Sequence, residues 1–204
     1  MVVSKSDGSS ASYRLARSIG ILTAPPLMAL VATTWMYLYN AELFGDGAGW
    51  YWMALAFLTA LPVSAYILKM IIPSVRAQGR RGERRLAFIM SVAGYIIGTA
   101  ICLLRKAPRA VSGLFLSYLA SGVLLALVNA VLKFRASGHA CGFSGPLVYL
   151  ARIAEPLPVL VCSVIALPLV YWARLHQGRH SLRELLWGTL VGLTATGLVM
   201  LLYM

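Results

Sequence analysis

The segment "LPVLVCSVIALPLVYW" (157–172) decides the fold, because an apolar run of this length without a charged residue is typical of a helix that crosses a lipid bilayer. The residues that follow, "ARLHQGRHSLRE" (173–184), include three arginines, two histidines and one glutamate. Hydrocarbon does not tolerate such a density of charges and donors. The polar stretch is therefore expected to lie at one end of a membrane span, where the chain turns into the next span.

Long apolar runs recur along the whole chain, of which 60% is hydrophobic. Backbone polar groups in lipid are satisfied only in helices or closed barrels, and these continuous, non-alternating runs favour helices. The sequence thus predicts an all-α fold, a polytopic bundle of six to seven transmembrane helices in one domain (16–204) after a disordered basic N-terminus (1–15). The expected spans are 18–40, 49–72, 86–104, 111–132, 141–154, 157–173 and 185–203. The fifth is short, so it is expected to be tilted, buried by its neighbours or incomplete.

Basic residues are distributed unevenly between the two sides of this predicted bundle. The net charge is +12, and most of the 18 lysines and arginines fall on the side of the N-terminus and of the loops after the second, fourth and sixth spans. The exceptions are Arg105, Lys106, Arg109 and Arg152. Positive residues in short loops are retained in the cytoplasm, so this side is expected to be cytoplasmic, in the plasma membrane of a prokaryote. Anionic headgroups or a phosphate-bearing lipid, rather than nucleic acid, are the expected partners.

Two loops that contain histidine are expected to meet on the basic side. "KFRASGHACG" (133–142) follows the fourth span and "ARLHQGRHSLRE" follows the sixth, so two crossings return the chain to the same face. His139 and His180 can then form a pair in which one imidazole attacks phosphorus and the other protonates the leaving oxygen. Arginine side chains nearby can hold the non-bridging oxygens. Glu184 stands four residues after His180, and in a helix this spacing would let the carboxylate reach the imidazole.

Both loops resemble signatures of the type 2 phosphatidic acid phosphatase superfamily, which are lipid phosphatases related to vanadium haloperoxidases. "ASGHA" (136–140) is similar to the signature Pro-Ser-Gly-His, and "ARLHQGRHSLRE" is similar to Ser-Arg, five residues, His, three residues and Asp. The spacing is preserved throughout, and the resemblance covers residues 130–195. Three positions depart from the signatures: Ala136 replaces the proline, Ala173 replaces the serine, and Glu184 replaces the aspartate.

The resemblance implies hydrolysis of a phosphoester through a phosphohistidine, without a metal ion or a cofactor. It implies that His180 is the nucleophile, that Glu184 orients it and that His139 is the general acid. The residues that would hold the phosphoryl group are Arg174, Ser137 and Gly138.

The first signature of the superfamily, Lys, six residues and Arg-Pro, is not cleanly present. Lys69 and Arg76 have its spacing, but Ala77 replaces the proline. Other basic residues are therefore expected to supply phosphate ligands in its place, one from each of two pairs. The first pair is Arg84 and Arg85, and the second pair is Lys133 and Arg135.

The sequence leads to a lipid phosphatase as the expected function. The substrate would be a lipid phosphate or diphosphate monoester such as phosphatidic acid, phosphatidylglycerophosphate or a polyprenyl diphosphate. Two alternatives stay open. One is a lipid carrier or scaffold without enzymatic activity. The other is a lipid phosphotransferase, which would share the covalent intermediate with a phosphatase.

Overall fold

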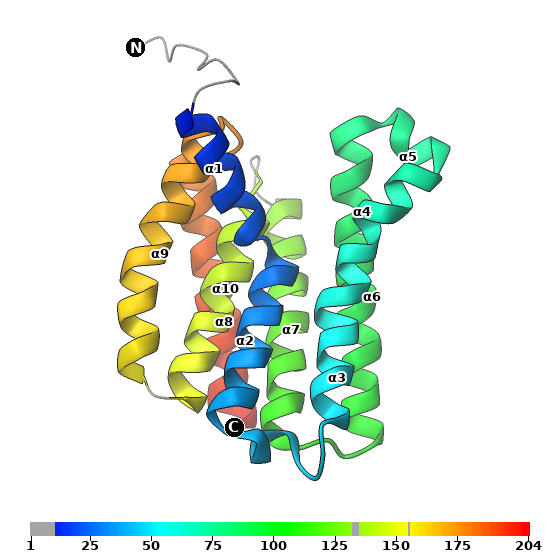
Figure 1. Cartoon of the computed structure of the whole chain (residues 1–204), viewed down its shortest axis with the longest axis vertical. Helices are drawn as coiled ribbons and strands as arrows, with labels where there is room; N and C mark the ends of the chain where they lie inside the picture. Colours follow the sequence, from blue (N-terminus) through cyan, green and yellow to red (C-terminus); the bar gives the residue numbers. More distant parts are fainter. Residues whose placement is uncertain (1–10, 132–134, 155) are drawn as a thin grey trace.

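The computed structural model describes residues 11–131, 135–154 and 156–204 of the chain. In this described part the protein is helical, without a β-strand, and its long helices run side by side in an upright bundle (Figure 1). The predicted all-α fold is therefore confirmed. The first helix, α1 (Ala11–Leu22), includes residues 11–15, so the expectation of disorder is wrong for that part of the N-terminal segment. Residues 1–10 lie outside the described part.

Five helical segments are long and apolar enough to cross a bilayer, so the protein is an integral membrane protein. They are Gly49–Ile71, α6 (Gly79–Leu104), α7 (Arg109–Val131), Leu157–His176 within α9 (Pro156–His176), and α10 (Leu182–Tyr203). The first of the five consists of α3 (Gly49–Leu55), the π-helix η2 (Ala56–Ala60) and α4 (Leu61–Ile71). Two of the expected spans, 18–40 and 141–154, are not single helices long enough to cross the bilayer.

The first expected span is broken into α1 and α2 (Pro25–Tyr39), which meet at an angle of 57°. Pro25 and Pro26 begin α2, and Ala24 before them has an extended backbone with φ −63° and ψ 142°. A residue that precedes proline is disfavoured in the helical region, so the chain turns at this point. Taken together, α1 and α2 are long and apolar enough to count as a sixth span.

The fifth expected span is α8 (Gly138–Ile153), a helix of 16 residues. At 1.5 Å per residue its length is about 24 Å, which is less than the thickness of the hydrocarbon core. α8 packs against α2, α7, α9 and α10 near the middle of the bundle (Figure 1). Burial by its neighbours is therefore the explanation for its short length that the structure supports.

Small residues let α8 and α10 approach each other closely. A side chain at Gly192 of α10 would overlap Ser144 of α8, and a side chain at Gly188 would overlap the backbone of Ser137. Ser144 Oγ also donates to the carbonyl of Thr189 across this contact at 3.1 Å. Membrane helices commonly associate through small residues and interhelical hydrogen bonds of this kind. The contact fixes the starts of the two helices relative to each other.

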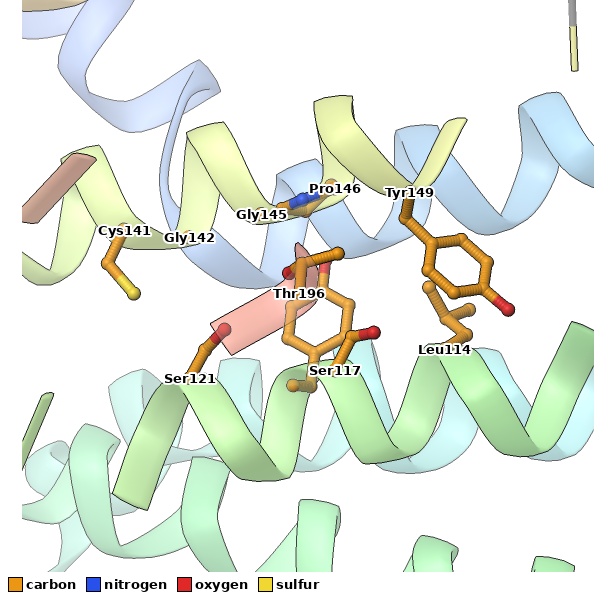
Figure 2. A pocket seen from close by; sticks show the side chains of 10 residues that line it. Leu114, Ser117, Ser121, Cys141, Gly142, Gly145, Pro146, Tyr149 and Thr196 are labelled. Carbon is orange, nitrogen blue, oxygen red and sulfur yellow. The ribbon is translucent and has the colours of Figure 1, made fainter. Parts of the chain in front are cut away.

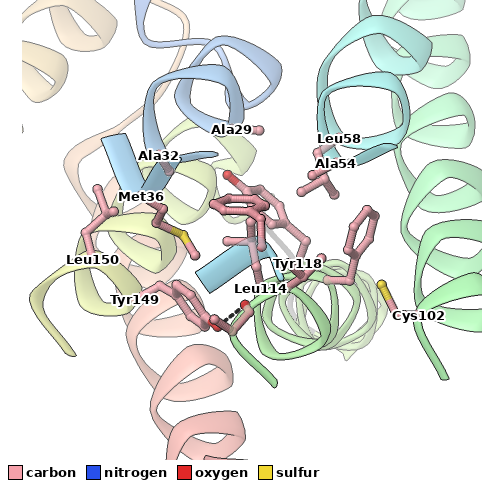
Figure 3. Close-up of a cluster of buried hydrophobic side chains, with 14 of the residues drawn as sticks. Ala29, Ala32, Met36, Ala54, Leu58, Cys102, Leu114, Tyr118, Tyr149 and Leu150 are labelled. Carbon is pink, nitrogen blue, oxygen red and sulfur yellow. Dashed lines mark hydrogen bonds between the residues drawn. The ribbon is translucent and has the colours of Figure 1, made fainter. Parts of the chain in front are cut away.

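The largest cluster of buried apolar side chains joins α2, α3, η2, α6, α7 and α8. Figure 3 shows Met36, Leu58, Leu114 and Tyr149 converging in this cluster. The Tyr149 hydroxyl donates to the carbonyl of Ala110 at the start of α7, at 2.5 Å. A buried tyrosine needs such a partner for its polar end, and this one ties α8 to α7.

The π-helix η2 lies where the second span passes the break between α1 and α2. Thr59 Oγ1 of η2 donates to the carbonyl of Pro26 at 3.1 Å. On the other side, a side chain at Gly94 of α6 would overlap the carbonyl of Phe57. η2 is thus held between the first turn of α2 and a close approach of α6.

The connections are divided between two ends of the bundle, as the sequence predicts. α5 (Pro73–Ala77), the start of α8 and the turn between α9 and α10 lie at the end where α1 begins (Figure 1). The 3-10 helix η1 (Ala41–Phe44) and the turn between α6 and α7 lie at the opposite end. We call the first of these the basic end, because most lysines and arginines of the chain fall there.

Replacing Gly98 of α6 by alanine is expected to destabilise the protein, because the added methyl group would overlap the ring of Phe115 in α7. Overpacking of this kind costs about 1–3 kcal/mol. The matched control is Gly197→Ala in α10, where no described atom lies within 4 Å of an added Cβ. Alanine has the higher helix propensity, so the control should be unchanged or stabilised. Thermal unfolding in detergent measures both variants, and equal melting temperatures would contradict the close α6–α7 contact.

Candidate active site

The structure brings both histidine motifs to the basic end. His139 is the second residue of α8, and His180 directly precedes Ser181, which caps α10. The backbone N–H of Ser137 donates to the carbonyl of Glu184 at 2.8 Å, so the first turns of α8 and α10 are held side by side. His139 and His180 are near enough for their charges to interact. Both histidines therefore lie at the adjoining starts of these two helices.

Glu184 reaches His180 through the cap of α10. Its Oε2 accepts from the backbone N–H of Ser181 at 2.8 Å, and Ser181 Oγ accepts from the backbone N–H of Glu184 at 3.3 Å. The same Oε2 lies 3.3 Å from Nδ1 of His180. This reciprocal pattern is a capping box. The expected contact is present, but its cause is the cap and not a shared helical face, because His180 precedes the helix.

The contact between Glu184 and His180 is close without being aligned as a hydrogen bond, since His180 Nδ1 has no such partner among the described residues. Both side chains are partly exposed, at 18% for His180 and 23% for Glu184. A small rotation of either side chain would complete the hydrogen bond. In that geometry Nδ1 carries the proton, and Nε2 has a free lone pair.

The environment of His180 disfavours its charged form. Burial is the main cause that lowers the pKa of His180 below its usual value, and the charges of Arg174 and Arg84 lower it as well. Glu184 acts in the opposite direction, through its negative charge. The neutral imidazole is the form that can attack phosphorus. The site therefore favours the nucleophilic form of His180 at neutral pH.

Arg174, a predicted phosphate ligand, lies near the end of α9 and is 2% exposed. Its Nη2 donates to the carbonyl of Gly20 in α1, and its charge acts on both His139 and His180. Its Nε has no hydrogen-bond partner among the described residues. A buried charge without a carboxylate partner is costly, so Arg174 retains a capacity to bind an anion.

Ser137 and Gly138, also predicted to hold phosphate, form the start of α8. Ser137 is fully buried, and its hydroxyl accepts from the backbone N–H of Ala140 at 3.3 Å as the cap of the helix. Asn129 of α7 fixes the residue before it, because Asn129 Oδ1 accepts from the N–H of Ala136 at 2.6 Å. Ser137 therefore has a structural role in the cap, beside His139, whatever contact it makes with a phosphate.

Of the four alternative phosphate ligands, Arg84 interacts electrostatically with the site. Arg84 lies in the first part of α6, and its charge acts on His180. Arg84, Arg85 and Arg135 are all exposed at the basic end, and Nε of Arg84 donates to the carbonyl of Arg80 at 3.3 Å. Lys133 lies outside the described residues. Arg179, in the turn after α9, is a further cation whose charge acts on His139.

A polar cluster on α4 and α6 was missed by reasoning from the sequence. Lys69 Nζ forms an ion pair with Glu83 Oε2 at 2.8 Å and lies 5.8 Å from the ring centre of Tyr66. Tyr66 is near enough to Arg174 for the two to interact electrostatically. The available signal was Glu83, an acidic residue within the arginine-rich segment 80–85. Lys69, which has the spacing of the first signature, is thus paired with a carboxylate.

A small cavity lies between α7, α8 and α10 (Figure 2). Ser117, Ser121 and Thr196 are among its lining residues, together with Cys141 and Tyr149. Its volume is about 20 Å³, which is room for roughly one water molecule. This cavity is too small for a phosphate ester, and neither histidine lines it, so it is separate from the candidate site.

Comparison with known proteins adds no assignment. No family model matches the chain, and no match is found among curated proteins or among solved structures. Within the described ranges, no group of three histidine, cysteine, aspartate or glutamate side chains is placed to hold a metal ion. What supports a function is therefore the geometry of the basic end and the two motifs that lie there.

Replacing Glu184 by glutamine is expected to lower the pKa of His180 further, because a neutral amide no longer attracts the imidazolium. The amide can still take part in the capping box, so the fold should be retained. Arg84→Gln is the matched opposite change and is expected to raise the pKa of His180, since it removes a repelling charge. NMR titration of protein with labelled histidine in nanodiscs measures both shifts. Shifts of the same sign in the two variants would contradict the described electrostatics.

Proposed function

We propose that this protein is a membrane lipid phosphatase that hydrolyses a phosphate or diphosphate monoester of a lipid through a phosphohistidine at His180, without a metal ion. Phosphatidic acid, phosphatidylglycerophosphate and polyprenyl diphosphates are the candidate substrates. The observation that carries the proposal is the 3.3 Å contact between His180 Nδ1 and Glu184 Oε2, made beside a second histidine and several cations. The proposal also rests on the resemblance of both motifs to the type 2 phosphatidic acid phosphatase superfamily.

In the first step, Nε2 of neutral His180 attacks phosphorus, and the bond between phosphorus and the leaving oxygen breaks. The electron pair of that bond goes to the leaving oxygen, which takes a proton from protonated His139. The lipid alcohol departs, or a lipid monophosphate when the substrate is a diphosphate. Glu184 stabilises the positive charge that develops on the ring of His180, because its carboxylate faces Nδ1.

In the second step, water attacks the phosphorus atom of the phosphohistidine. His139, now neutral, takes a proton from this water, and the bond between phosphorus and Nε2 breaks. The electron pair returns to Nε2, inorganic phosphate is released, and both histidines regain their starting protonation. The cycle consumes one water molecule and requires no other reactant.

The surrounding cations account for the charge on the reacting group. Arg174, Arg179 and Arg84 all act electrostatically on one or the other histidine, so they lie where they could stabilise the non-bridging oxygens. In the absence of an anion, burial is the main cause that lowers the pKa of His139 below its usual value, and the charges of Arg174 and Arg179 lower it further. A bound phosphate opposes this lowering, since its negative charge favours the protonated imidazole. Binding of substrate thus prepares the general acid.

The location of the site suits a lipid substrate. The histidines lie at the basic end of a bundle whose outer surface is apolar, with exposed side chains such as Leu160, Val164 and Leu186. The apolar tail of a lipid could stay in the bilayer while its phosphate reaches the cationic groups at the surface. We further propose that the basic end faces the cytoplasm, because positive residues in short loops are retained there.

Release of phosphate from a panel of lipid phosphates in excess chelator tests the mechanism. His180→Ala is expected to reduce activity to background, and His139→Ala is expected to lower it by about 100- to 10,000-fold, the range for a lost general acid. His176→Ala is the matched control, since this third histidine stacks on Trp172 at the end of α9 and has no role in the chemistry. The control should keep its activity.

Three outcomes of this assay would each reject a different part of the proposal. Full activity in His180→Ala would exclude the nucleophile. Loss of activity in chelator would contradict a metal-free mechanism. An absence of phosphate release from every lipid tested would favour a carrier or scaffold, or a phosphotransferase if the phosphoryl group appears on an acceptor lipid.

Labelling of single cysteines in intact cells tests the orientation. Arg105→Cys, in the turn between α6 and α7, should react with a membrane-impermeant maleimide, because that turn is expected to lie outside. Arg80→Cys at the basic end is the matched exposed position and should react only after the cells are opened. The native residue Cys162 is exposed and is replaced by serine in both variants. The reverse labelling pattern would place the basic end outside.

A further inference from the structure

The end of α1 covers the candidate site. The carbonyl of Gly20 accepts a hydrogen bond from Nη2 of Arg174, and the imidazole of His139 lies near enough to the backbone of the same residue to interact with it. Gly20 is buried, and a Cβ there would lie 3.1 Å from the guanidinium carbon of Arg174. The backbone of Gly20 therefore interacts with two side chains of the proposed mechanism. Arg174 would bind the phosphate, and His139 would protonate the leaving oxygen.

The break between α1 and α2 explains why this carbonyl is available. In an unbroken helix the N–H of Ala24 would donate to the carbonyl of Gly20. Here the N–H of Ala24 donates to Ile21 instead, at 3.0 Å, as the chain turns toward Pro25. The last carbonyls of a helix also carry the negative end of its dipole. The oxygen of Gly20 thus offers partial negative charge to Arg174 and His139, as an oxygen of a phosphate would.

A second contact holds α1 in place one turn earlier. Gln177 Nε2, directly after α9, donates to the carbonyl of Ala16 at 2.8 Å and also to the carbonyl of Ala173 in α9 at 2.8 Å. Gln177 has no part in the proposed chemistry, and its amide lies 2.9 Å from where a Cβ of Gly20 would be. The contact between α1 and α9 can therefore be weakened without changing a group that touches the substrate.

We propose that α1 is a lid: the carbonyl of Gly20 takes the position of a phosphoryl oxygen when no substrate is bound, and the phosphate of the substrate displaces it. This inference rests on the proposed function of the same site. Displacement is favourable because a phosphate oxygen carries a larger negative charge than a carbonyl oxygen, and a phosphate can accept two parallel hydrogen bonds from a guanidinium. Nε of Arg174, which has no partner among the described residues, would gain one. The 57° break before Pro25 provides the hinge.

Weakening the lid is expected to increase the apparent affinity for inorganic phosphate as a competitive inhibitor. When the binding-competent state is a minor one, apparent affinity rises in proportion to its population. Gln177→Ala removes the bond to Ala16 and should lower the inhibition constant roughly fivefold, the factor for one net hydrogen bond. Ser18→Ala, at an exposed position of α1, is the control and should leave the constant unchanged. An unchanged constant in Gln177→Ala would count against the lid.

Locking the lid is expected to abolish turnover. Ala16→Cys and Gln177→Cys, in a Cys162→Ser background, can be joined as a disulfide by a small membrane-permeant oxidant, with each single cysteine variant as control. If α1 only supports the site, the joined protein should keep its activity, and that result would overturn the proposal. Loss of activity on cross-linking, with the single variants active after the same treatment, would support it.

Hydrogen exchange separates failure of the lid from failure of the proposed function. Inorganic phosphate should increase amide exchange in residues 19–24 of the full-length wild-type protein, whether or not the protein hydrolyses a lipid. Faster exchange without turnover would keep the lid and reject the phosphatase. Turnover with unchanged exchange would keep the phosphatase and reject the lid.

Discussion

The first turn of α10 is the constraint on which the candidate site depends. A single carboxylate oxygen of Glu184 is shared between the backbone N–H of Ser181 and the imidazole of His180. Because the cap is a local structure, the position of the carboxylate is set by the four residues 181–184 and not by distant packing. The neighbouring bond from Ser137 to the carbonyl of Glu184 then attaches the start of α8 to the same turn. Helix capping and the proposed orientation of the nucleophile are therefore one interaction.

Charge at the basic end is only partly compensated. Among the described residues there, Glu83 pairs with Lys69 and Glu184 lies beside His180, while Arg174 is buried without a carboxylate. A buried cation normally shifts toward neutrality or is paired. The carbonyl oxygen of Gly20 supplies a weak substitute, because it presents the negative end of the α1 dipole. This excess of cations over anions is what would favour a phosphate over a neutral lipid headgroup.

Reasoning from the sequence predicted the parts of the fold that depend on local pattern. Continuous apolar runs marked the spans, and parity of crossings placed both histidines at one end. The contact of Glu184 with His180 was expected for the wrong reason, since a cap and not a helical face produces it. Contacts between segments far apart in the chain could not be predicted from the sequence. Arg174 and Gly20 are 154 residues apart, and only the packing of α1 against α9 shows that they are in contact.

The π-helix η2 has a geometric consequence for the upper half of the second span. A π-turn adds one residue to a helix, and one residue corresponds to a rotation of about 100° around the helix axis. The side chains after η2 are thus rotated about the helix axis, compared with the positions they would take if α3 continued as a regular α-helix. With that rotation Lys69 faces Glu83 of α6. Deletion of one residue in 56–60 would restore regular α-helical phase and turn the α4 side chains away from their present partners.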